Sequence, residues 1–225
     1  MLSLKLGLSV ASSGVGTAWI PDSESTLEAW FKKGAQISLV GSDVSQWGDS
    51  SIKGIDMVQA TASERPAYAD GVLTFDDNNT QSLQSTNQIS LEGDFTIGAK
   101  LKVTTSGGVL LGDNTTSGEF IRFSTNTQFR VRIDNTTAVN IDKDSGNWLE
   151  DAYMVLVRSS DVLKLYWNGV AQTDTETLSG TADIDTIGVR RTDLNPYDGD
   201  ISEIQIYSSS STALTDRVND YLSTL

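Results

Sequence analysis

Acidic side chains are the residues of this chain best suited to chemistry, and they gather at three places. These clusters are Asp183 with Asp185, Asp198 with Asp200 and Glu203, and Glu150 next to Asp151. Two carboxyl groups about 5–9.5 Å apart can hydrolyse a glycoside when one of them stays protonated. Most of these acids stand where strands are expected to begin or turn, a position at which Asp ordinarily ends strand pairing. We therefore predict no catalytic residues and no enzymatic activity, and a ligand or metal contact is the alternative for the second cluster.

Two residue types that carry much enzyme chemistry are missing, because the chain has no His and no Cys. Their absence excludes disulfides, thiolate and imidazole metal sites, haem with His or Cys ligands, Cys nucleophiles and the Ser-His-Asp triad. Asp and Glu number 30 against 16 Lys and Arg, which leaves a formal net charge of −14. Such a chain repels phosphate backbones, so we expect no nucleic-acid partner.

Two tryptophans and two arginines are the candidate ligand contacts. Sugar rings stack on exposed aromatic faces, and Trp148 opens a predicted strand after a turn while Trp167 precedes a hairpin turn. The alternative for both is packing in the core. Arg190 and Arg191 share a loop, where they are able to grip an acidic partner or pair with neighbouring carboxylates. A solvated loop is the alternative for the arginines.

The first ten residues alternate apolar and polar side chains, which predicts a strand with one apolar face. Its apolar positions are Leu2, Leu4, Leu6, Leu8 and Val10. Residues 11–17 are small and rich in Gly, as in flexible linkers. Lys5 interrupts the apolar part, so we interpret the segment as unprocessed rather than as a signal peptide, and no apolar stretch is long enough to predict a membrane span. Residues 1–17 are expected to form an arm that pairs with its own domain or adds to a sheet edge of another chain.

The remaining residues, 18–225, predict one all-β domain. Ser and Thr make up nearly a quarter of the chain and Pro only 3 residues, as suits short strands joined by polar turns. Asn168 with Gly169 is a strong two-residue hairpin signal, and only residues 212–222 predict a helix. The predicted strands are residues 27–31, 37–40, 44–47, 71–76, 95–103, 109–111, 120–123, 129–133, 153–158, 162–167, 184–189 and 201–207.

The first of these strands also yields a prediction about faces. Successive side chains of a strand point to opposite sides of a sheet. Residues 27–31 should therefore present Leu27, Ala29 and Phe31 on one face and Trp30 on the other.

Seven segments, in this order and spacing, make the chain resemble the concanavalin A-like, laminin-G-like modules found in bacteriophage virion proteins. The segments are residues 29–31, 41–50, 59–66, 72–76, 94–97, 165–169 and 199–207 with the helix that follows. The resemblance implies a jelly-roll sandwich of two antiparallel sheets with a short C-terminal helix. It also implies where a structural calcium sits in relatives, which often carry an acid at the position of Ser202. Because calcium needs six to eight oxygen ligands, we predict no metal and no cofactor here, with a retained calcium as the alternative.

These observations lead to three hypotheses about function. The first is a non-enzymatic structural protein of the phage virion, a capsid decoration or tail-associated adhesin, which the resemblance implies. In it the arm of residues 1–17 contacts other virion proteins, and the sandwich forms a homo-oligomer and faces outward. The second hypothesis is a carbohydrate-binding module that recognises a surface glycan. The third is a glycoside hydrolase, against which the missing acid-rich strand counts.

Overall fold

Antiparallel strands make up most of the computed structural model, which describes residues 19–114, 120–133, 136–191 and 193–225. The strands are β1 (Leu27–Phe31), β2 (Ile37–Val40), β3 (Asp43–Trp47), β4 (Met57–Val58), β5 (Ala67–Ala69), β6 (Val72–Phe75), β7 (Leu83–Leu91), β8 (Phe95–Val103), β9 (Val109–Gly112), β10 (Phe120–Phe123), β11 (Gln128–Arg132), β12 (Val139–Asp142), β13 (Asp151–Ser159), β14 (Val162–Trp167), β15 (Val170–Thr177), β16 (Ala182–Ile187) and β17 (Gly199–Tyr207). The helices are three 3₁₀ turns, Pro21–Ser23, Ala62–Glu64 and Asp77–Asn79, and one α-helix, α1 (Thr212–Ser223). The predicted all-β fold with a C-terminal helix is confirmed.

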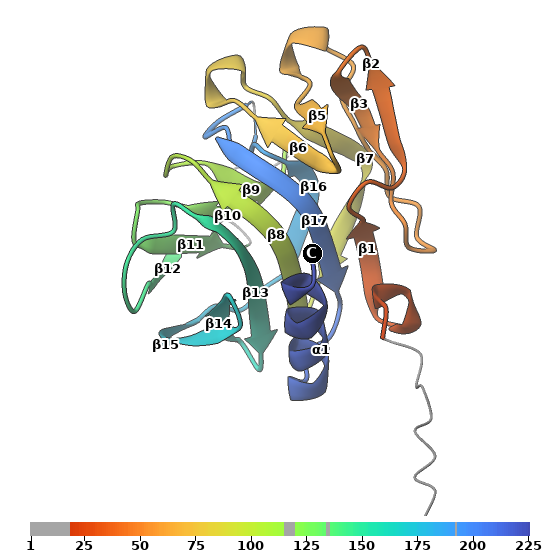
Figure 1. Ribbon diagram of the computed structural model, residues 1–225. Helices are drawn as coiled ribbons and strands as arrows, with labels where there is room; N and C mark the ends of the chain where they lie inside the picture. The colour runs from red at the N-terminus through yellow and green to blue at the C-terminus, as the bar shows by residue number, and fades with distance from the viewer. Residues whose placement is uncertain (1–18, 115–119, 134–135, 192) are drawn as a thin grey trace, which may run out of the picture.

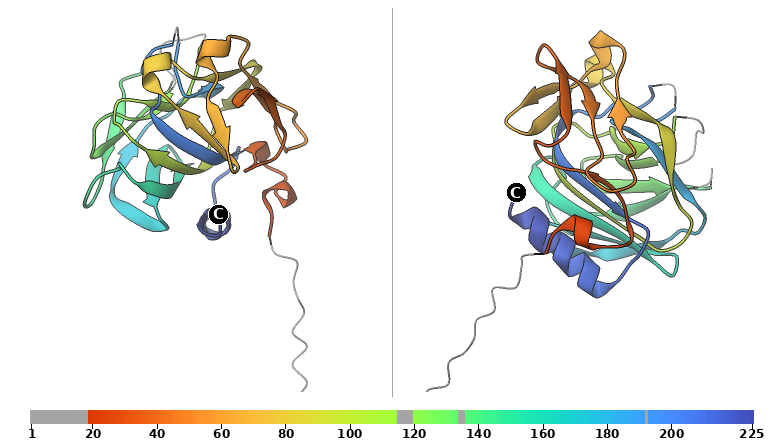
Figure 2. Two further views of the ribbon diagram at one scale, coloured as in Figure 1. Left: turned by 45° about the horizontal axis from the view of Figure 1, so that its top comes forward. Right: turned by 90° about the vertical axis from the view of Figure 1, so that its right-hand side faces the viewer.

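Hydrogen bonds join all the described strands into one continuous sheet that curls round the core (Figures 1 and 2). One run is β15–β14–β13–β8–β17–β1, and the other is β12–β11–β10–β9–β16–β7–β4. Strands β6, β5 and β3 connect the two runs, because β6 pairs with β17 and β3 pairs with β4. On the other side the Asp142 backbone N–H of β12 donates to the Asp174 carboxylate of β15 at 2.7 Å. The sheet is thus nearly closed. The sequence predicted two separate sheets, and the structure does not divide the strands cleanly in that way.

The space between the two runs holds the main hydrophobic core. Each run presents alternate side chains to it, as the period of two requires. Fully buried members from both runs are Ile97, Leu156, Leu165, Leu111, Val131 and Phe129. The opposite face of each run is left for the helix or for solvent.

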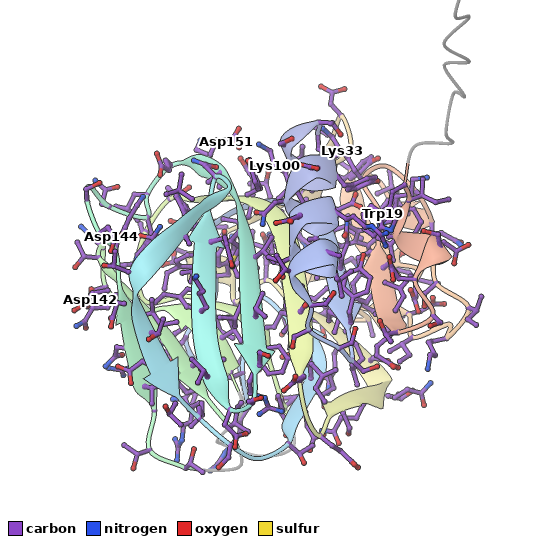
Figure 3. All side chains as sticks on the ribbon, turned by 90° about the horizontal axis from the view of Figure 1, so that it is seen from below. Trp19, Lys33, Lys100, Asp142, Asp144 and Asp151 are labelled. Carbon is purple, nitrogen blue, oxygen red and sulfur yellow. The ribbon has the colours of Figure 1, made fainter. Side chains whose placement is uncertain are left out.

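Helix α1 covers the outer face of β8 and β13 (Figure 3). Its Leu214, Val218 and Leu222 are buried in a second, smaller apolar cluster. Gly98 of β8 allows the close approach, since a Cβ at this position would lie 2.6 Å from Val218 Cγ1. At the start of the described chain Trp19 packs edge-on against Tyr221 of α1, with ring centroids 6.1 Å apart.

Strand β1 corrects the predicted faces of residues 27–31. Ala29 and Phe31 point into the main core, but Leu27 joins Trp30 in the cluster beneath α1. The pairing of β1 with β17 shifts register between Leu27 and Ala29. Because a bulge adds one residue, it reverses the face of every side chain on its far side.

The helix and the hairpin turn agree closely with their predictions. Helix α1 begins at Thr212, and the side chain of Ser211 caps it by accepting from the Leu214 backbone N–H. Asn168 and Gly169 both have positive φ, 49° and 77°, as a tight primed turn between β14 and β15 requires. No helix in the described part of the chain is long and apolar enough to span a bilayer.

Candidate functional site

Five neighbouring strands, β7, β16, β9, β10 and β11, carry the candidate site on the face that points away from the core. Their register aligns one row of apolar side chains toward the core: Leu83, Ile187, Leu111, Ile121 and Val131. The adjacent row, which lies on the outer face, is Gln84, Thr186, Gly112, Phe120 and Arg132. This outer row crosses two pockets, one at each end.

The first pocket lies over β7 and β16, has a volume of about 610 Å³ and is called the polar pocket below. Most of the residues that line it have amide, hydroxyl or carboxyl side chains. They include Gln59, Gln84, Thr86, Asn114, Thr186, Glu64, Asp185 and Asp193. Side chains of this kind make directional hydrogen bonds to a ligand rich in hydroxyl groups.

Asp185 is the most perturbed acid of the polar pocket. It lies at a register shift of β16 and is 4% exposed, and its Oδ1 accepts from the Asn114 backbone N–H at 2.7 Å. Burial, assisted by the negative charges of Asp113 and Asp183, raises its pKa from 3.8 to about 6 and outweighs that hydrogen bond. Its carboxyl group therefore changes charge close to neutral pH.

The second pocket lies over β10 and β11, has a volume of about 380 Å³ and is called the arginine pocket. Its four cationic residues are Arg122, Arg130, Arg132 and Arg190, half of the eight arginines of the chain. Arg122 faces Arg130 directly across the β10–β11 pair. The guanidinium groups of Arg122 and Arg190 lie 5.3 Å and 5.0 Å from the centre of the Phe120 ring, within the range of a cation–π contact.

Hydrogen bonds from Nε orient three of the four guanidinium groups. The acceptors are Asn140 Oδ1 for Arg130 at 2.7 Å, the Thr136 carbonyl for Arg132 at 2.8 Å, and Asn195 Oδ1 for Arg190 at 3.1 Å. Arg122 differs, because its Nε is buried and has no hydrogen-bond partner among the described residues. Burial, together with the like charges of Arg130 and Arg190, lowers the pKa of Arg122 from its usual value.

Gly112 brings Arg190 into this pocket. The loop after β16 crosses the outer row there, and a Cβ on Gly112 would lie 2.3 Å from the Val189 carbonyl oxygen and 3.0 Å from Arg190 Cα. The Thr186 hydroxyl donates to the same Val189 carbonyl at 2.6 Å. Val189 lines the polar pocket and Arg190 lines the arginine pocket, so this loop forms the boundary between the two.

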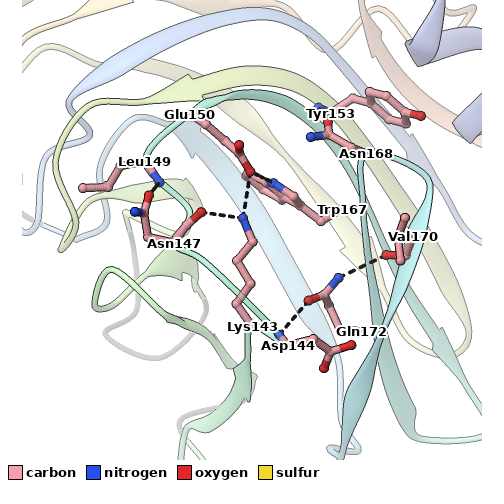
Figure 4. A network of polar contacts seen from close by, with 10 residues as sticks. All are labelled: Lys143, Asp144, Asn147, Leu149, Glu150, Tyr153, Trp167, Asn168, Val170 and Gln172. Carbon is pink, nitrogen blue, oxygen red and sulfur yellow. Dashed lines mark hydrogen bonds and ion pairs between the residues drawn. The ribbon is translucent and has the colours of Figure 1, made fainter.

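Both tryptophans proposed as sugar contacts are buried instead. Trp148 is 0% and Trp167 4% exposed, and their rings pack edge-to-face 4.9 Å apart. The Trp167 indole N–H and the Lys143 ammonium group both donate to Glu150 Oε1, at 2.5 Å and 2.7 Å (Figure 4). Both rings therefore pack in a core aromatic cluster with Phe123, which was the alternative prediction for them, and Trp167 also lines a surface pocket beside Lys143.

The two predicted arginines lie in different surroundings. Arg190 belongs to the arginine pocket. Arg191 is exposed outside it, and its backbone N–H donates to the Asp113 carbonyl at 3.0 Å. The predicted arm of residues 1–17 lies outside the described residues.

The acids considered for a calcium site serve separate contacts. Glu203 is buried beneath Trp30, whose indole N–H donates to it, and it also accepts from the Lys33 backbone N–H at 2.6 Å. Asp200 accepts from the Thr74 hydroxyl at 2.7 Å, and Ser202 is buried. Within the described ranges no group of three or more acids could hold a metal ion.

Sequence reasoning missed most of the residues that line these pockets. Arg130 and Arg132 alternate with Phe129 and Val131, so their common outward face was readable from the period of two. The polar strand β7 was not predicted, and with it the position of Gln84 was missed. The approach of Arg190 to β10 had no local signal.

A family model of the concanavalin A-like lectin/glucanase superfamily matches residues 68–215, about two thirds of the chain. The protein therefore belongs to this superfamily. No curated protein sequence matches it.

Solved structures of low identity share the fold. Domain 4 of AbnA, an extracellular GH43 arabinanase from Geobacillus stearothermophilus in complex with arabinotriose, aligns with a TM-score of 0.56 at 17% identity, over 88% of this chain and 98% of that domain. A Trypanosoma rangeli sialidase in complex with the inhibitor DANA aligns with a TM-score of 0.55 at 13% identity. The alignment covers 86% of this chain but only 32% of the sialidase, so the chain spans about a third of that enzyme's length.

Proposed function

We propose that this protein is a non-enzymatic carbohydrate-binding module and that the outer face of β7, β16, β9, β10 and β11 is its binding surface. The observation that carries the proposal is the pair of pockets on one face, lined by amide, hydroxyl and guanidinium groups. Domain 4 of the arabinanase, which has the same fold over nearly its whole length, is in complex with arabinotriose. The jelly-roll arrangement is part of the proposal, with each run of strands acting as one layer of the sandwich.

A glycan-binding measurement with matched variants tests this function. Gln84 lines the polar pocket, whereas Gln88 is exposed further along the same strand and lies outside the pocket. We expect the protein to bind at least one glycan on an array. Calorimetry on the best ligand then measures the affinity of each variant. The Gln84→Ala variant should bind about 5- to 10-fold more weakly, as loss of one hydrogen bond implies, and Gln88→Ala should bind normally. Equal affinities of the two variants, or silence across the array, would contradict the proposal.

The polar pocket also provides the test for the glycoside hydrolase alternative. Glu64, Asp185 and Asp193 all line it, and a carboxyl with a raised pKa is what a general acid needs. We propose that Asp185 does not act as a general acid, because it is largely buried and already accepts a hydrogen bond from the Asn114 backbone N–H. Release of reducing sugar from a bound oligosaccharide, abolished by Asp185→Asn, would establish the hydrolase instead.

A structural role in a bacteriophage virion is proposed alongside, on the sequence resemblance and the alternating residues Leu2 to Val10. In this role the arm of residues 1–17 attaches the protein to other virion proteins and supports a homo-oligomer, while the sandwich is displayed. Five apolar side chains contribute at most on the order of 10 kcal/mol if fully buried, before the cost of ordering. Deleting residues 1–16 should leave a folded domain that no longer enters particles, as measured by co-sedimentation. Normal incorporation would refute the anchoring role.

A further inference from the structure

We infer that the arginine pocket binds the carboxylate or sulfate group of an acidic saccharide whose neutral part extends toward the polar pocket. This inference rests on the proposed carbohydrate binding and specifies the class of glycan. Nothing in the resemblance or in the related structures assigns a ligand to these arginines.

Like charges converge on the arginine pocket. Three strand arginines and one loop arginine line a single pocket of about 380 Å³ in a chain whose net charge is −14. Burying a guanidinium group beside like charges is unfavourable unless an anion compensates it. Arg122 shows the imbalance directly, since it makes no ion pair with any described residue and its buried Nε has no acceptor.

The arginine side chains are also arranged around one opening. Arg122 and Arg130 stand opposite each other on adjacent strands, and Arg190 shares the Phe120 ring with Arg122. Guanidinium groups bind carboxylate and sulfate oxygens through parallel charge-assisted hydrogen bonds. Several such groups around one opening surround an oxyanion from more than one side.

The polar pocket restricts what the rest of the ligand is. Two strand spacings, about 10 Å, separate Thr186 in the polar pocket from Phe120 in the arginine pocket. The polar pocket contains Glu64, Asp185 and Asp193, which repel a second anion. A ligand that fits both pockets therefore has an anionic group at one end and neutral hydroxyl groups at the other. An acidic saccharide has this form, whereas a polyanionic peptide or a nucleic acid does not.

The test is an array of matched glycans, each in neutral, carboxylated and sulfated form, including lactose, 3′-sialyllactose and 3′-sulfolactose. We expect at least one acidic form to bind about 10-fold or more tightly than its neutral counterpart, and the preference to shrink as salt screens the charges. The carboxylated and sulfated arms identify which oxyanion is used. An oligoglutamate peptide is included, and tighter binding of that peptide than of every acidic glycan would overturn the inference.

Three variants, each of which removes one positive charge, show which arginines bind the acidic group. Arg122→Gln and Arg130→Gln should abolish the acidic preference and keep neutral binding. Arg217→Gln, on α1 and paired with Glu24, is the control and should retain the preference. Neutral binding that depends on Gln84 without any acidic preference would overturn the inference while leaving the proposed function intact. Silence toward every glycan would overturn both.

A stability measurement separates ligand binding from a structural role. Arg122→Gln removes one charge from a repulsive cluster together with a buried Nε that has no partner among the described residues, so its melting temperature should be equal to or higher than that of the wild type. Arg122→Lys, which keeps the charge but lacks the planar fork, should fold normally and bind the acidic glycan more weakly. A marked fall in melting temperature in both variants, with the acidic preference unchanged, would show that these arginines serve folding.

Discussion

Replacing Asp185 by Asn tests whether burial of this carboxyl group weakens the fold at neutral pH. The native pKa of Asp185 is about 6 against 3.8 in an exposed site, chiefly because of desolvation. A carboxyl with a raised native pKa holds its proton more tightly in the folded state. Its stabilising contribution is therefore complete below pH 3.8 and is lost as the pH rises through about 6. Asn has the same shape, and its side-chain oxygen still accepts from the Asn114 backbone N–H.

The magnitude follows from the gap between the two pKa values. At about 1.4 kcal/mol for each pKa unit, ionised Asp185 lowers the free energy of unfolding by up to about 3 kcal/mol above pH 7. The Asp185→Asn variant should exceed the wild type by up to that amount at about pH 8 and match it at about pH 3.5. In a domain of this size the gain corresponds to a rise in melting temperature of up to about 6–12 °C.

The assay is urea unfolding followed by tryptophan fluorescence at several pH values, with Asp142→Asn as the control. Asp142 is exposed at the end of β12, so its substitution relieves no burial of a charge and should not raise the free energy of unfolding at pH 8. The slope of unfolding against urea should be equal in all three proteins, since none changes the surface buried. Parallel pH profiles for Asp185→Asn and the wild type would refute the argument from burial.

Three further substitutions test packing in other parts of the fold. Trp30→Phe removes the indole donor to buried Glu203 and should lower the free energy of unfolding by about 2 kcal/mol, and an unchanged urea midpoint would contradict this. Gly112→Ala places a methyl group against the Val189 carbonyl, so thermal unfolding should show a loss of about 1–3 kcal/mol, and calorimetry should show weaker acidic-glycan binding. Trp148→Ala empties core volume and should cost about 3–5 kcal/mol while the folded fraction binds glycan normally; lost binding at full stability would restore its role as a sugar contact.

Local patterns predicted the elements whose formation depends on nearby residues. The helix was expected at residues 212–222 and runs from Thr212 to Ser223, because its apolar spacing and Ser211 cap are local features. The Asn168 and Gly169 turn was readable for the same reason. Strand β7 was missed because its central residues, 84–88, are all polar. The strand is held by pairing with β16 and β4, which its own sequence does not indicate.

Composition and periodicity alone determined that this chain is an acidic, all-β protein with a short C-terminal helix, without disulfides or His and Cys chemistry. The tertiary structure decided which side chains meet. Arg122, Arg130, Arg132 and Arg190 come from strands and a loop that are brought together by the β9–β10–β11 pairing and by the room that Gly112 leaves. Burial decided the roles of other side chains. A Trp ring contacts a sugar only where its face is exposed, and it is a core residue where it is covered. The pKa of an Asp rises when burial removes water from its carboxyl group. Exposure and proximity of distant residues are properties of the packed chain, so no local pattern contains them.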